Sequence, residues 1–285
     1  MRRRWVVVLG LVTVLATVAT ACGSDNGDKG GGGGGTSMTL EKGTLQIGSD
    51  MPYRPFEFET SSGQPTGFDV ELMNAIADRL NLKPVWVNAN FDTIVPALAG
   101  NRFDVIASAM TAYAPKGSPA YSIVTDRATK VSFSKPYYDS LQSLTINKAK
   151  TPDITSVDQL KSGDRVGIQR GSTGAFWAEE NLAPKGVELV SYTKVPDMYN
   201  ALEAGQLVGA VNDLPVSLDA IQSKPTLTVA TQISTGEQYA FAVNQKNTEL
   251  LNAIDEQLQA LIDDGTYLKI FQKYFPDQEP PSFAQ

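Results

Sequence analysis

The feature that most constrains the fold is a strand, a hairpin and an amphipathic helix that follow one another within residues 43–80. Apolar and β-branched residues predict the strand at Thr44–Ser49. After a turn with prolines and an aromatic run, Gly63 and Pro65 indicate the tip of a hairpin. Apolar residues then recur at three- and four-residue spacing, which predicts a helix with one buried stripe. The stripe consists of Val70, Met73, Ile76, Ala77 and Leu80.

Strands and helices continue to alternate beyond this helix. A strand at 84–88, a helix at 92–99 and a strand at 103–108 come next. This βαβ order predicts a sheet with a parallel core, and therefore an α/β fold. A second α/β run begins with the strand Leu141–Ile146. Its further elements are helices at 156–161, 172–182, 196–204 and 214–223, strands at 165–169, 187–191, 207–212, 227–230 and 238–243, and final helices at 247–263 and 266–274.

The lead-in to the first helix carries a second signal, because it matches a known family. The run from Gly67 to Leu72, GFDVEL, follows an Asp-x-x-Tyr-x-Pro-Phe pattern at 50–56. With the apolar positions up to Leu80, it resembles the N-terminal segment of the family 3 solute-binding proteins of ABC transporters, the receptors for polar amino acids. A chance amphipathic helix would produce the apolar stripe but not this lead-in. The resemblance extends from about Gly43 to Phe275.

The resemblance implies a two-lobed, periplasmic-binding-protein-like (type II) α/β fold with a two-strand hinge. The first lobe would comprise residues 43–137 and 233–285, and the second lobe residues 138–232. The hinge strands would lie near 138–140 and 231–237. Proteins of this architecture close on a ligand by hinge motion.

The N-terminus has the three parts of a secretion signal. Arg2–Arg4 are charged, residues 5–20 are almost wholly apolar, and small residues end the segment at Ala21. This pattern predicts a signal peptide over residues 1–21. A membrane-spanning helix is the alternative, although the apolar run is slightly shorter than the roughly 20 residues that a span needs.

Cys22 is the only cysteine, so an intramolecular disulfide is impossible. Its position after small residues resembles a bacterial lipobox, although Ala19 stands where leucine is commonest. The resemblance implies cleavage before Cys22 and a lipid anchor on its sulfur, which would place the protein on the extracytoplasmic face of the cell membrane. The alternative is a free thiol beside an ordinary cleavage site. Residues 22–42 include six consecutive glycines and are expected to form a flexible tether.

Composition excludes several classes of function. The chain has no histidine, which rules out Ser-His-Asp and Cys-His nucleophiles and every histidine-ligated metal site. Its formal net charge is −7 and its basic residues do not cluster, which argues against nucleic acid as a partner. The sequence contains neither a P-loop nor a dinucleotide fingerprint. No cofactor and no metal ion are therefore expected.

An α-amino acid carries two opposite charges, and a dry cleft must pair both of them. A guanidinium suits the carboxylate because it can donate two parallel hydrogen bonds. The resemblance assigns this role to Arg127, in a helix start at 125–128, and it assigns Ser108, Ala109 and Thr111 to a loop that faces the ligand. The alternative for Arg127 is a surface position on its helix.

Residues 112–122, AYAPKGSPAYS, depart from the family pattern, because relatives pass directly from the loop to the arginine. The segment is rich in Pro, Gly, Ala and Ser, so it is expected to be a loop. It would either cover the mouth of the cleft or lie on the surface.

Two strand ends in the second lobe supply further candidates. The strand at 165–169 leads to Ser172 and Thr173 at a helix start, where free N–H groups attract an anion. The resemblance places the amino-acid carboxylate at Thr173. The strand at 207–212 ends at Asp213, where relatives hold the α-ammonium. The alternatives are a plain helix cap at Ser172 or Thr173 and an N-cap role for Asp213.

Four residues match family positions that face the ligand side chain: Asp50, Tyr53, Phe91 and Gln169. The rings of Tyr53 and Phe91 could enclose a flat or aliphatic group. Asp50 could accept hydrogen bonds from an ammonium, a guanidinium, an imidazole or an amide. The alternative for Asp50 is a turn residue that bonds its own backbone.

Together these features favour a lipid-anchored, monomeric receptor that delivers a free polar or basic amino acid to the permease subunits of an ABC importer, and not an enzyme. The alternative is an enzyme on the same fold, similar to the cyclohexadienyl dehydratases. It would need a general acid in the cleft, for which Asp50 is the only candidate. A sensor domain is a third interpretation, but neither a membrane helix nor a signalling domain is expected after Phe275.

Overall fold

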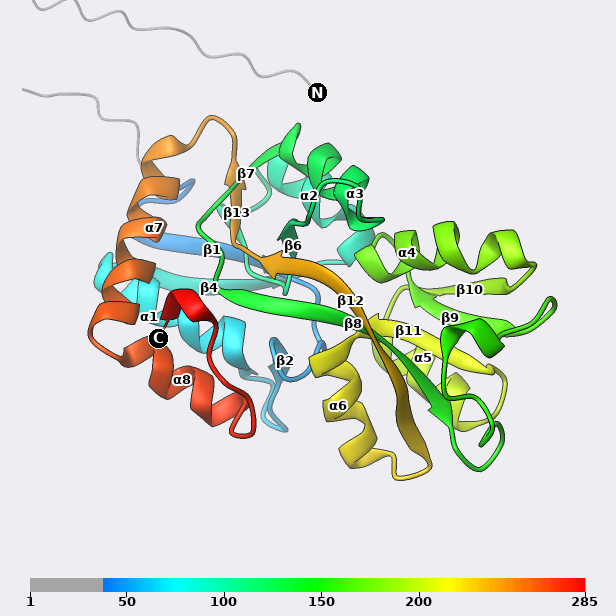
Figure 1. The fold of residues 1–285 in the computed structure, drawn as a ribbon. Helices are drawn as coiled ribbons and strands as arrows, with labels where there is room; N and C mark the ends of the chain where they lie inside the picture. The colour runs from blue at the N-terminus through cyan, green and yellow to red at the C-terminus, as the bar shows by residue number, and fades with distance from the viewer. Residues whose placement is uncertain (1–37, 285) are drawn as a thin grey trace, which may run out of the picture. The chain divides into compact units, whose positions relative to one another are not determined.

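Two large β-sheets, a two-stranded sheet and the helices packed against them form residues 38–284, the part of the chain that the computed structural model describes (Figure 1). The expected signal peptide, Cys22 and the tether up to residue 37 lie outside these residues. The described residues belong to one unit of the chain.

The first sheet has the strand order β4-β1-β5-β13-β7. β1 (Thr44–Ser49) lies parallel to β4 (Lys83–Asn88) and to β5 (Val105–Ile106). β13 (Ala242–Asn244) pairs antiparallel with β5 and with β7 (Val131–Phe133). The parallel core predicted from the βαβ order is therefore confirmed for β1, β4 and β5.

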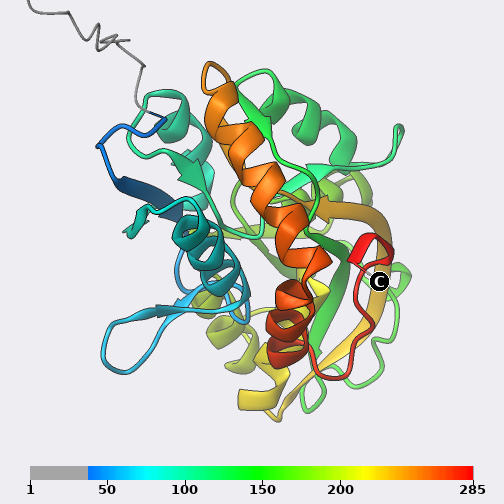
Figure 2. The same ribbon diagram turned by 90° about the vertical axis from the view of Figure 1, so that its left-hand side faces the viewer.

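Four helices accompany the first sheet. α1 (Phe68–Arg79) and α2 (Phe91–Ala99) connect its parallel strands, while α7 (Thr248–Asp263) and α8 (Thr266–Tyr274) come from the C-terminal part of the chain. The predicted apolar stripe of α1 is buried except for Leu80, which caps the helix and is partly buried. Both α7 and α8 pack against α1, and Figure 2 shows α7 beside it.

The second sheet has the strand order β10-β9-β11-β8-β12-β6. Its strands are β6 (Thr111–Tyr113), β8 (Tyr138–Asn147), β9 (Arg165–Gln169), β10 (Glu188–Tyr192), β11 (Gly209–Asp213) and β12 (Leu227–Tyr239), and the helices near it are α3 (Ala120–Ala128), α4 (Thr173–Asn181), α5 (Val195–Glu203) and α6 (Leu214–Ser223). β9, β10 and β11 are parallel, which continues the α/β pattern. The predicted hairpin is also present, as β2 (Phe58–Glu59) and β3 (Pro65–Thr66).

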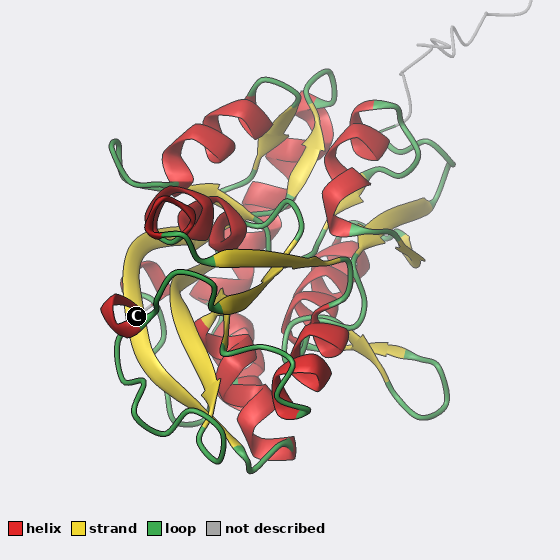
Figure 3. Ribbon diagram, turned by 90° about the vertical axis from the view of Figure 1, so that its right-hand side faces the viewer, coloured by secondary structure: helices red, strands yellow, loops and turns green. Residues whose placement is uncertain are grey.

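Two long strands join the sheets. β8 and β12 form a long antiparallel pair (Figure 3). Tyr138 lies opposite Tyr239 at one end of the pair and Asn147 opposite Leu227 at the other. The chain enters β8 from the first sheet and leaves β12 into β13 of the first sheet. The α/β fold with a two-strand hinge is thus confirmed.

Aromatic rings fill the junction between the crossing strands and the helices of the first sheet. The ring of Phe56 lies 5.0 Å from that of Tyr138 and 5.3 Å from that of Tyr239, and Tyr138 stacks on Tyr239 at 5.5 Å. Phe68 and Phe275 complete the cluster. Each such pair contributes about 0.5–1.5 kcal/mol beyond its burial. The cluster holds the ends of β8 and β12 beside the segment that follows β1.

Four predicted elements differ clearly from the structure. The helix predicted at 156–161 is a single 3-10 turn at Val157–Gln159, and the strand predicted at 103–108 is limited to β5. The strands predicted at 227–230 and 238–243 are a continuous β12 followed by the short β13. Pairing with β8 keeps the intervening residues extended, which local sequence does not indicate.

The prediction that residues 112–122 form a loop is wrong. The segment starts inside β6, which pairs with the end of β12, and it ends inside α3. Only residues 114–119, which contain its Pro and Gly, lie between these elements. α3 is stable because Ala120, Ile123 and Val124 recur on its buried side.

The last five residues of the predicted tether, 38–42, are attached to the folded body. The N–H of Leu40 donates to a carboxylate oxygen of Asp104 over 2.7 Å, and the other oxygen accepts from the N–H of Gln46 over 2.8 Å. The carbonyl of Met38 accepts from Asn247 over 3.0 Å. Asp104 thus links residues 38–42 to β1.

Candidate ligand-binding site

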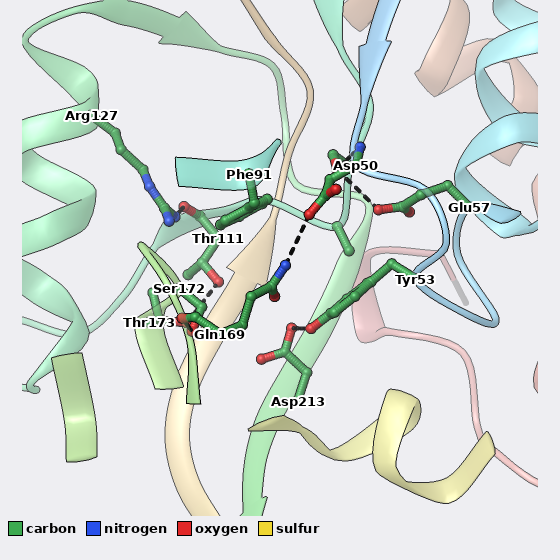
Figure 4. A pocket seen from close by; sticks show the side chains of 12 residues that line it. Asp50, Tyr53, Glu57, Phe91, Thr111, Arg127, Gln169, Ser172, Thr173 and Asp213 are labelled. Atoms are coloured by element: carbon green, nitrogen blue, oxygen red, sulfur yellow. Dashed lines mark hydrogen bonds between the residues drawn. The ribbon is translucent and has the colours of Figure 1, made fainter. Parts of the chain in front are cut away.

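A small cavity lies where strand ends of the two sheets meet (Figure 4). Its volume is about 10 Å³, which is about the space of one water molecule. All ten residues predicted from the sequence to bind a ligand line this cavity: Asp50, Tyr53, Phe91, Ser108, Ala109, Thr111, Arg127, Gln169, Thr173 and Asp213. Glu57 and Ser172 complete the lining.

The positions of these residues follow from the topology. Asp50 comes directly after β1 and Ser108 follows β5, so both lie at the carboxyl edge of the first sheet. Gln169 ends β9 and Asp213 ends β11, at the carboxyl edge of the second sheet. Open α/β sheets bind ligands outside the carboxyl ends of their strands. The topology therefore directs polar side chains from both sheets into one cleft.

Arg127 is buried, with 4% of its surface exposed, so the alternative of a surface arginine is wrong. Its guanidinium donates to the carbonyl of Thr111 over 2.7 Å and to the carbonyl of Gly171 over 2.9 Å, and it stands 5.4 Å from the ring centre of Phe91. Burial lowers the pKa of Arg127 to about 10, so the group stays protonated at neutral pH. Arg127 was predicted to lie at the start of a helix, but it lies in the last turn of α3.

Ser172 and Thr173 open α4 at the cavity. Ser172 is the N-cap residue, and its hydroxyl accepts from the N–H of Ala175 over 3.1 Å. The hydroxyl of Thr173 donates to the buried Glu237 of β12 over 2.5 Å, and the hydroxyl of Thr111 donates to the same carboxylate over 2.7 Å. Ser172 is therefore a helix cap, as one alternative predicted, whereas Thr173 forms a hydrogen bond with β12. The helix terminus still presents amide N–H groups without intrahelical acceptors.

Asp213 is an N-cap residue by position, but its side chain makes no cap hydrogen bond. Its carboxylate accepts instead from the hydroxyl of Tyr53 over 2.7 Å, from the hydroxyl of Tyr239 and from the side-chain amide of Gln142. Burial, followed by the nearby charge of Glu237, raises the pKa of Asp213 to about 6, against the lowering effect of these donors. The group is therefore mostly ionised at neutral pH and can pair with a cation.

Asp50 bonds across the cleft, so the alternative of a turn residue that bonds its own backbone is wrong. Its carboxylate contacts the ammonium of Lys194 and accepts from the side-chain amide of Gln169 over 3.0 Å. Burial raises the pKa of Asp50, while the hydrogen bond and the charge of Lys194 act in the opposite direction. The main-chain N–H of Asp50 donates to the hydroxyl of Ser108 over 2.9 Å, which fixes the position of the carboxylate.

Two buried acids support the segment Ser108–Ala109. Glu57 accepts from the hydroxyl of Ser108 over 3.0 Å, and Asp69 accepts from the N–H of Ala109 over 2.8 Å and from the hydroxyl of Tyr137 over 2.6 Å. Burial and the neighbouring charge of Asp69 raise the pKa of Glu57 well above its usual value, and burial raises that of Asp69 to about 7. The backbone around the cavity is thus held by side chains that are themselves inaccessible to water.

The two predicted aromatic residues line different parts of the cavity. Tyr53 stacks on Phe56 with ring centres 6.4 Å apart, and Phe91 lies beneath Arg127. Among the described ring contacts there is none between Tyr53 and Phe91.

Sequence reasoning missed five residues that shape the site: Glu57, Gln142, Lys194, Glu237 and Tyr239. Glu57 stands between two phenylalanines, and this position alone could have indicated a buried acid. Nothing near the other four signals a role, because their contacts depend on the pairing of β8 with β12 and on the meeting of the two sheets.

Residues 38–284 show neither a metal-binding cluster nor a membrane-spanning helix. No group of three or more acidic, histidine or cysteine side chains there is arranged to hold a metal ion. No helix in the same residues has the length and apolar character to cross a membrane.

The chain is similar to known proteins in both sequence and structure. Residues 45–277 match the model of the bacterial extracellular solute-binding proteins, family 3. The lysine/arginine/ornithine-binding periplasmic protein of Escherichia coli (strain K12) is 30% identical over 249 residues, which cover 81% of this chain and 87% of that protein.

Solved structures are also similar to this chain. An ancestral arginine-binding protein bound to arginine has a TM-score of 0.72 at 30% identity, covering 82% of this chain and 99% of that one. An ancestral amino-acid-binding protein, described as a precursor of cyclohexadienyl dehydratase, has a TM-score of 0.70 at 32% identity and covers 82% and 95%.

Proposed function

The chain belongs to the bacterial extracellular solute-binding proteins of family 3, and from this premise we propose that it binds a free polar or basic amino acid outside the cytoplasm and delivers it to the permease subunits of an ABC importer. It has the two-lobed type II fold of these proteins. The proteins that it resembles are binding proteins, and it is likewise a binding protein and not an enzyme.

The observation that carries the proposal is the presence of two opposite charges on the walls of one buried cavity. Arg127 and the N-terminus of α4 provide a positive end, and Asp213 provides a negative end that accepts hydrogen bonds. A free amino acid carries a carboxylate and an ammonium on neighbouring atoms, so it can satisfy both ends at once. A peptide within a chain has neither charge, and a simple sugar offers neither partner.

The cavity must widen to admit a ligand, because about 10 Å³ is far less than the volume of an amino acid. Hydrogen bonds now join its two sides: Asp50 to Gln169, Tyr53 to Asp213 and Arg127 to the carbonyl of Gly171. Ligand groups would replace these bonds one for one. In this proposal β8 and β12 act as the hinge, about which the lobe of residues 43–137 and 233–285 moves relative to that of residues 138–232.

The proposal includes a lipid anchor at Cys22. The signal peptide would be removed before Cys22, and a lipid on its sulfur, with the glycine-rich segment behind it, would hold a monomeric receptor near the permease. The support is the order of charged, apolar and small residues ahead of Cys22 and the six glycines behind it.

The acid that the dehydratase alternative requires is already bonded within the chain. Its only candidate acid was Asp50, and both carboxylate oxygens of Asp50 already accept hydrogen bonds from Lys194 and Gln169. The similar structure linked to dehydratases is itself described as an amino-acid-binding protein.

A thermal-shift screen of the twenty amino acids, on the chain without residues 1–21, tests the proposal. A ligand at about 100 times its Kd stabilises the folded state by roughly 2.7 kcal/mol, so a true ligand should raise Tm by several degrees. If none of the twenty raises Tm at millimolar concentration, the receptor proposal is wrong. Product formation from prephenate or arogenate would instead support the enzyme.

A further inference from the structure

Asp50 and Lys194 form an ion pair between the two sides of the cleft. Asp50 follows β1 in the first sheet, whereas Lys194 lies between β10 and α5 beside the second sheet. The ammonium of Lys194 contacts one carboxylate oxygen of Asp50 and donates to the carbonyl of Met51 over 3.1 Å. The side chain of Asp50 is 3% exposed and that of Lys194 is 29% exposed. Asp50, which is expected to bind the ligand side chain, is therefore already paired with a cation of the chain itself, Lys194.

Lys194 contacts Asp50 from outside the cavity and is partly exposed. It is absent from the residues that line the cavity, whereas Asp50 and Gln169 both line it. The side-chain amide of Gln169 donates to the second carboxylate oxygen of Asp50 over 3.0 Å. A ligand side chain that approaches Asp50 through the cavity would therefore compete with Gln169, which lines it, while Lys194 stays bound to the other carboxylate oxygen.

The Asp50–Lys194 ion pair should affect the binding of cationic and neutral ligand side chains differently. A cationic side chain would either lie beside the Lys194 ammonium in a dry cleft or separate Lys194 from Asp50, and both are unfavourable. A neutral group with a donor and an acceptor can donate to Asp50 and accept from Gln169 without breaking the ion pair. Repulsion of the wrong ligand is a recognised route to specificity.

Building on the proposed receptor function, we propose that Lys194 determines specificity at this site by disfavouring cationic ligand side chains relative to neutral carboxamide or ureido side chains. Lys194 forms no hydrogen bond or ion pair with Arg127 or Asp213 in the described structure. We therefore expect it to change the ratio of the affinities for charged and neutral ligand side chains.

Arginine and citrulline are matched probes, because they share their length and planar end but differ in charge; lysine and glutamine form a second pair. The dissociation constants would be measured by calorimetry for wild type, Lys194→Gln, Lys194→Met and Lys194→Arg. For either pair that binds, we expect Lys194→Gln and Lys194→Met to shift the ratio of the two constants at least fivefold in favour of the cation. Lys194→Arg, which keeps the charge, should stay within a factor of two of wild type.

Lys185→Gln is the matched control, because Lys185 pairs with Asp158 on the surface over 3.0 Å, away from the cavity. It should leave both ratios unchanged. A shift below fivefold in folded Lys194→Gln and Lys194→Met overturns the assignment of Lys194, while the receptor proposal stands. If wild type binds another amino acid but no member of either pair, the assignment of Lys194 is wrong and the receptor proposal still stands. If wild type binds no amino acid at all, both proposals fail.

Discussion

The hydroxyl oxygen of Tyr53 lies 2.7 Å from a carboxylate oxygen of Asp213, and this hydrogen bond joins the segment after β1 to the end of β11. Tyr239, from the end of β12, donates to the same carboxylate oxygen. One carboxylate therefore connects the first sheet, the second sheet and a hinge strand. An ammonium that binds Asp213 would compete with Tyr53 directly, which couples ligand binding to the relative position of the two sheets.

Arg127→Ala and Asp213→Ala should each abolish measurable amino-acid binding and leave the protein folded. Each change leaves one ligand charge without a partner in a desolvated cleft, which costs about 3–5 kcal/mol. That corresponds to a loss of roughly a hundred- to several-thousandfold in affinity. Calorimetry measures it, with circular dichroism as the check on folding.

Asp126→Ala is a control for this pair, because Asp126 is the exposed neighbour of Arg127 and pairs only with Lys130 among the described salt bridges. It should bind like wild type. An affinity within tenfold of wild type for Arg127→Ala or Asp213→Ala would remove that residue from the site.

The position of Asp50 predicts the order of ligands. Arginine, lysine, histidine or glutamine should bind at least tenfold tighter than glutamate or leucine, and among these four the charge of Lys194 should lower the affinity of the cations relative to glutamine. Glutamate would place its carboxylate against Asp50, and leucine would bury Asp50 without a new donor. Asp50→Ala should narrow this gap, because it removes the repulsion of glutamate and frees the cation of Lys194, while the main-chain charges of the ligand are still bound.

Competition calorimetry with these ligands checks the order, and Asp158→Asn on the surface serves as the control. If glutamate, aspartate or a branched aliphatic amino acid binds most tightly to wild type, the carboxylate of Asp50 does not select the side chain.

Cys22 should determine where the protein is found in the cell. Lipidation at Cys22 should place wild type in the membrane fraction, and Cys22→Ser should release the protein or leave the precursor uncleaved. Fractionation and gel mobility give the readout, with Ser24→Ala as a control that leaves the cysteine intact. A Cys22→Ser protein that fractionates and migrates like wild type would contradict the lipoprotein proposal.

The buried Asp69 should make stability depend on pH. Burial raises its pKa to about 7 in the folded protein, against about 3.9 in an unfolded chain. The folded state then binds more protons, so the contribution of Asp69 to the free energy of unfolding is fully present below about pH 4 and is lost as pH rises through 7. The slope is at most about 1.4 kcal/mol per pH unit for one proton.

Asp69→Asn retains an oxygen acceptor for Ala109 and Tyr137 but cannot titrate. The free energy of unfolding of wild type, relative to Asp69→Asn, should therefore fall between pH 4 and pH 7 in urea denaturation. The exposed Asp126→Asn should show no such trend. A difference between wild type and Asp69→Asn that is constant or rises over this range would contradict the prediction.

Local patterns were sufficient for the elements that bury one face. The spacing of apolar residues predicted α1, and the bounds of β9, α6 and α8 agree with the structure residue for residue. Local patterns failed in β12, where pairing with a distant strand overrides local preference. They also failed at residues 112–122, whose composition suggested a loop although a partner strand and a buried helix face were available.

Sequence patterns alone placed Asp50, Gln169 and Asp213 at the ends of strands, and the family resemblance grouped them with seven further residues as one site. Their partners were decided by tertiary structure alone. Asp213 has three donors because β11, β8, β12 and the segment after β1 converge there, and Asp50 meets Lys194 although 144 positions separate them. The physical reason is that a buried carboxylate needs donors from any direction in space, and only the meeting of the two sheets decides which side chains supply them.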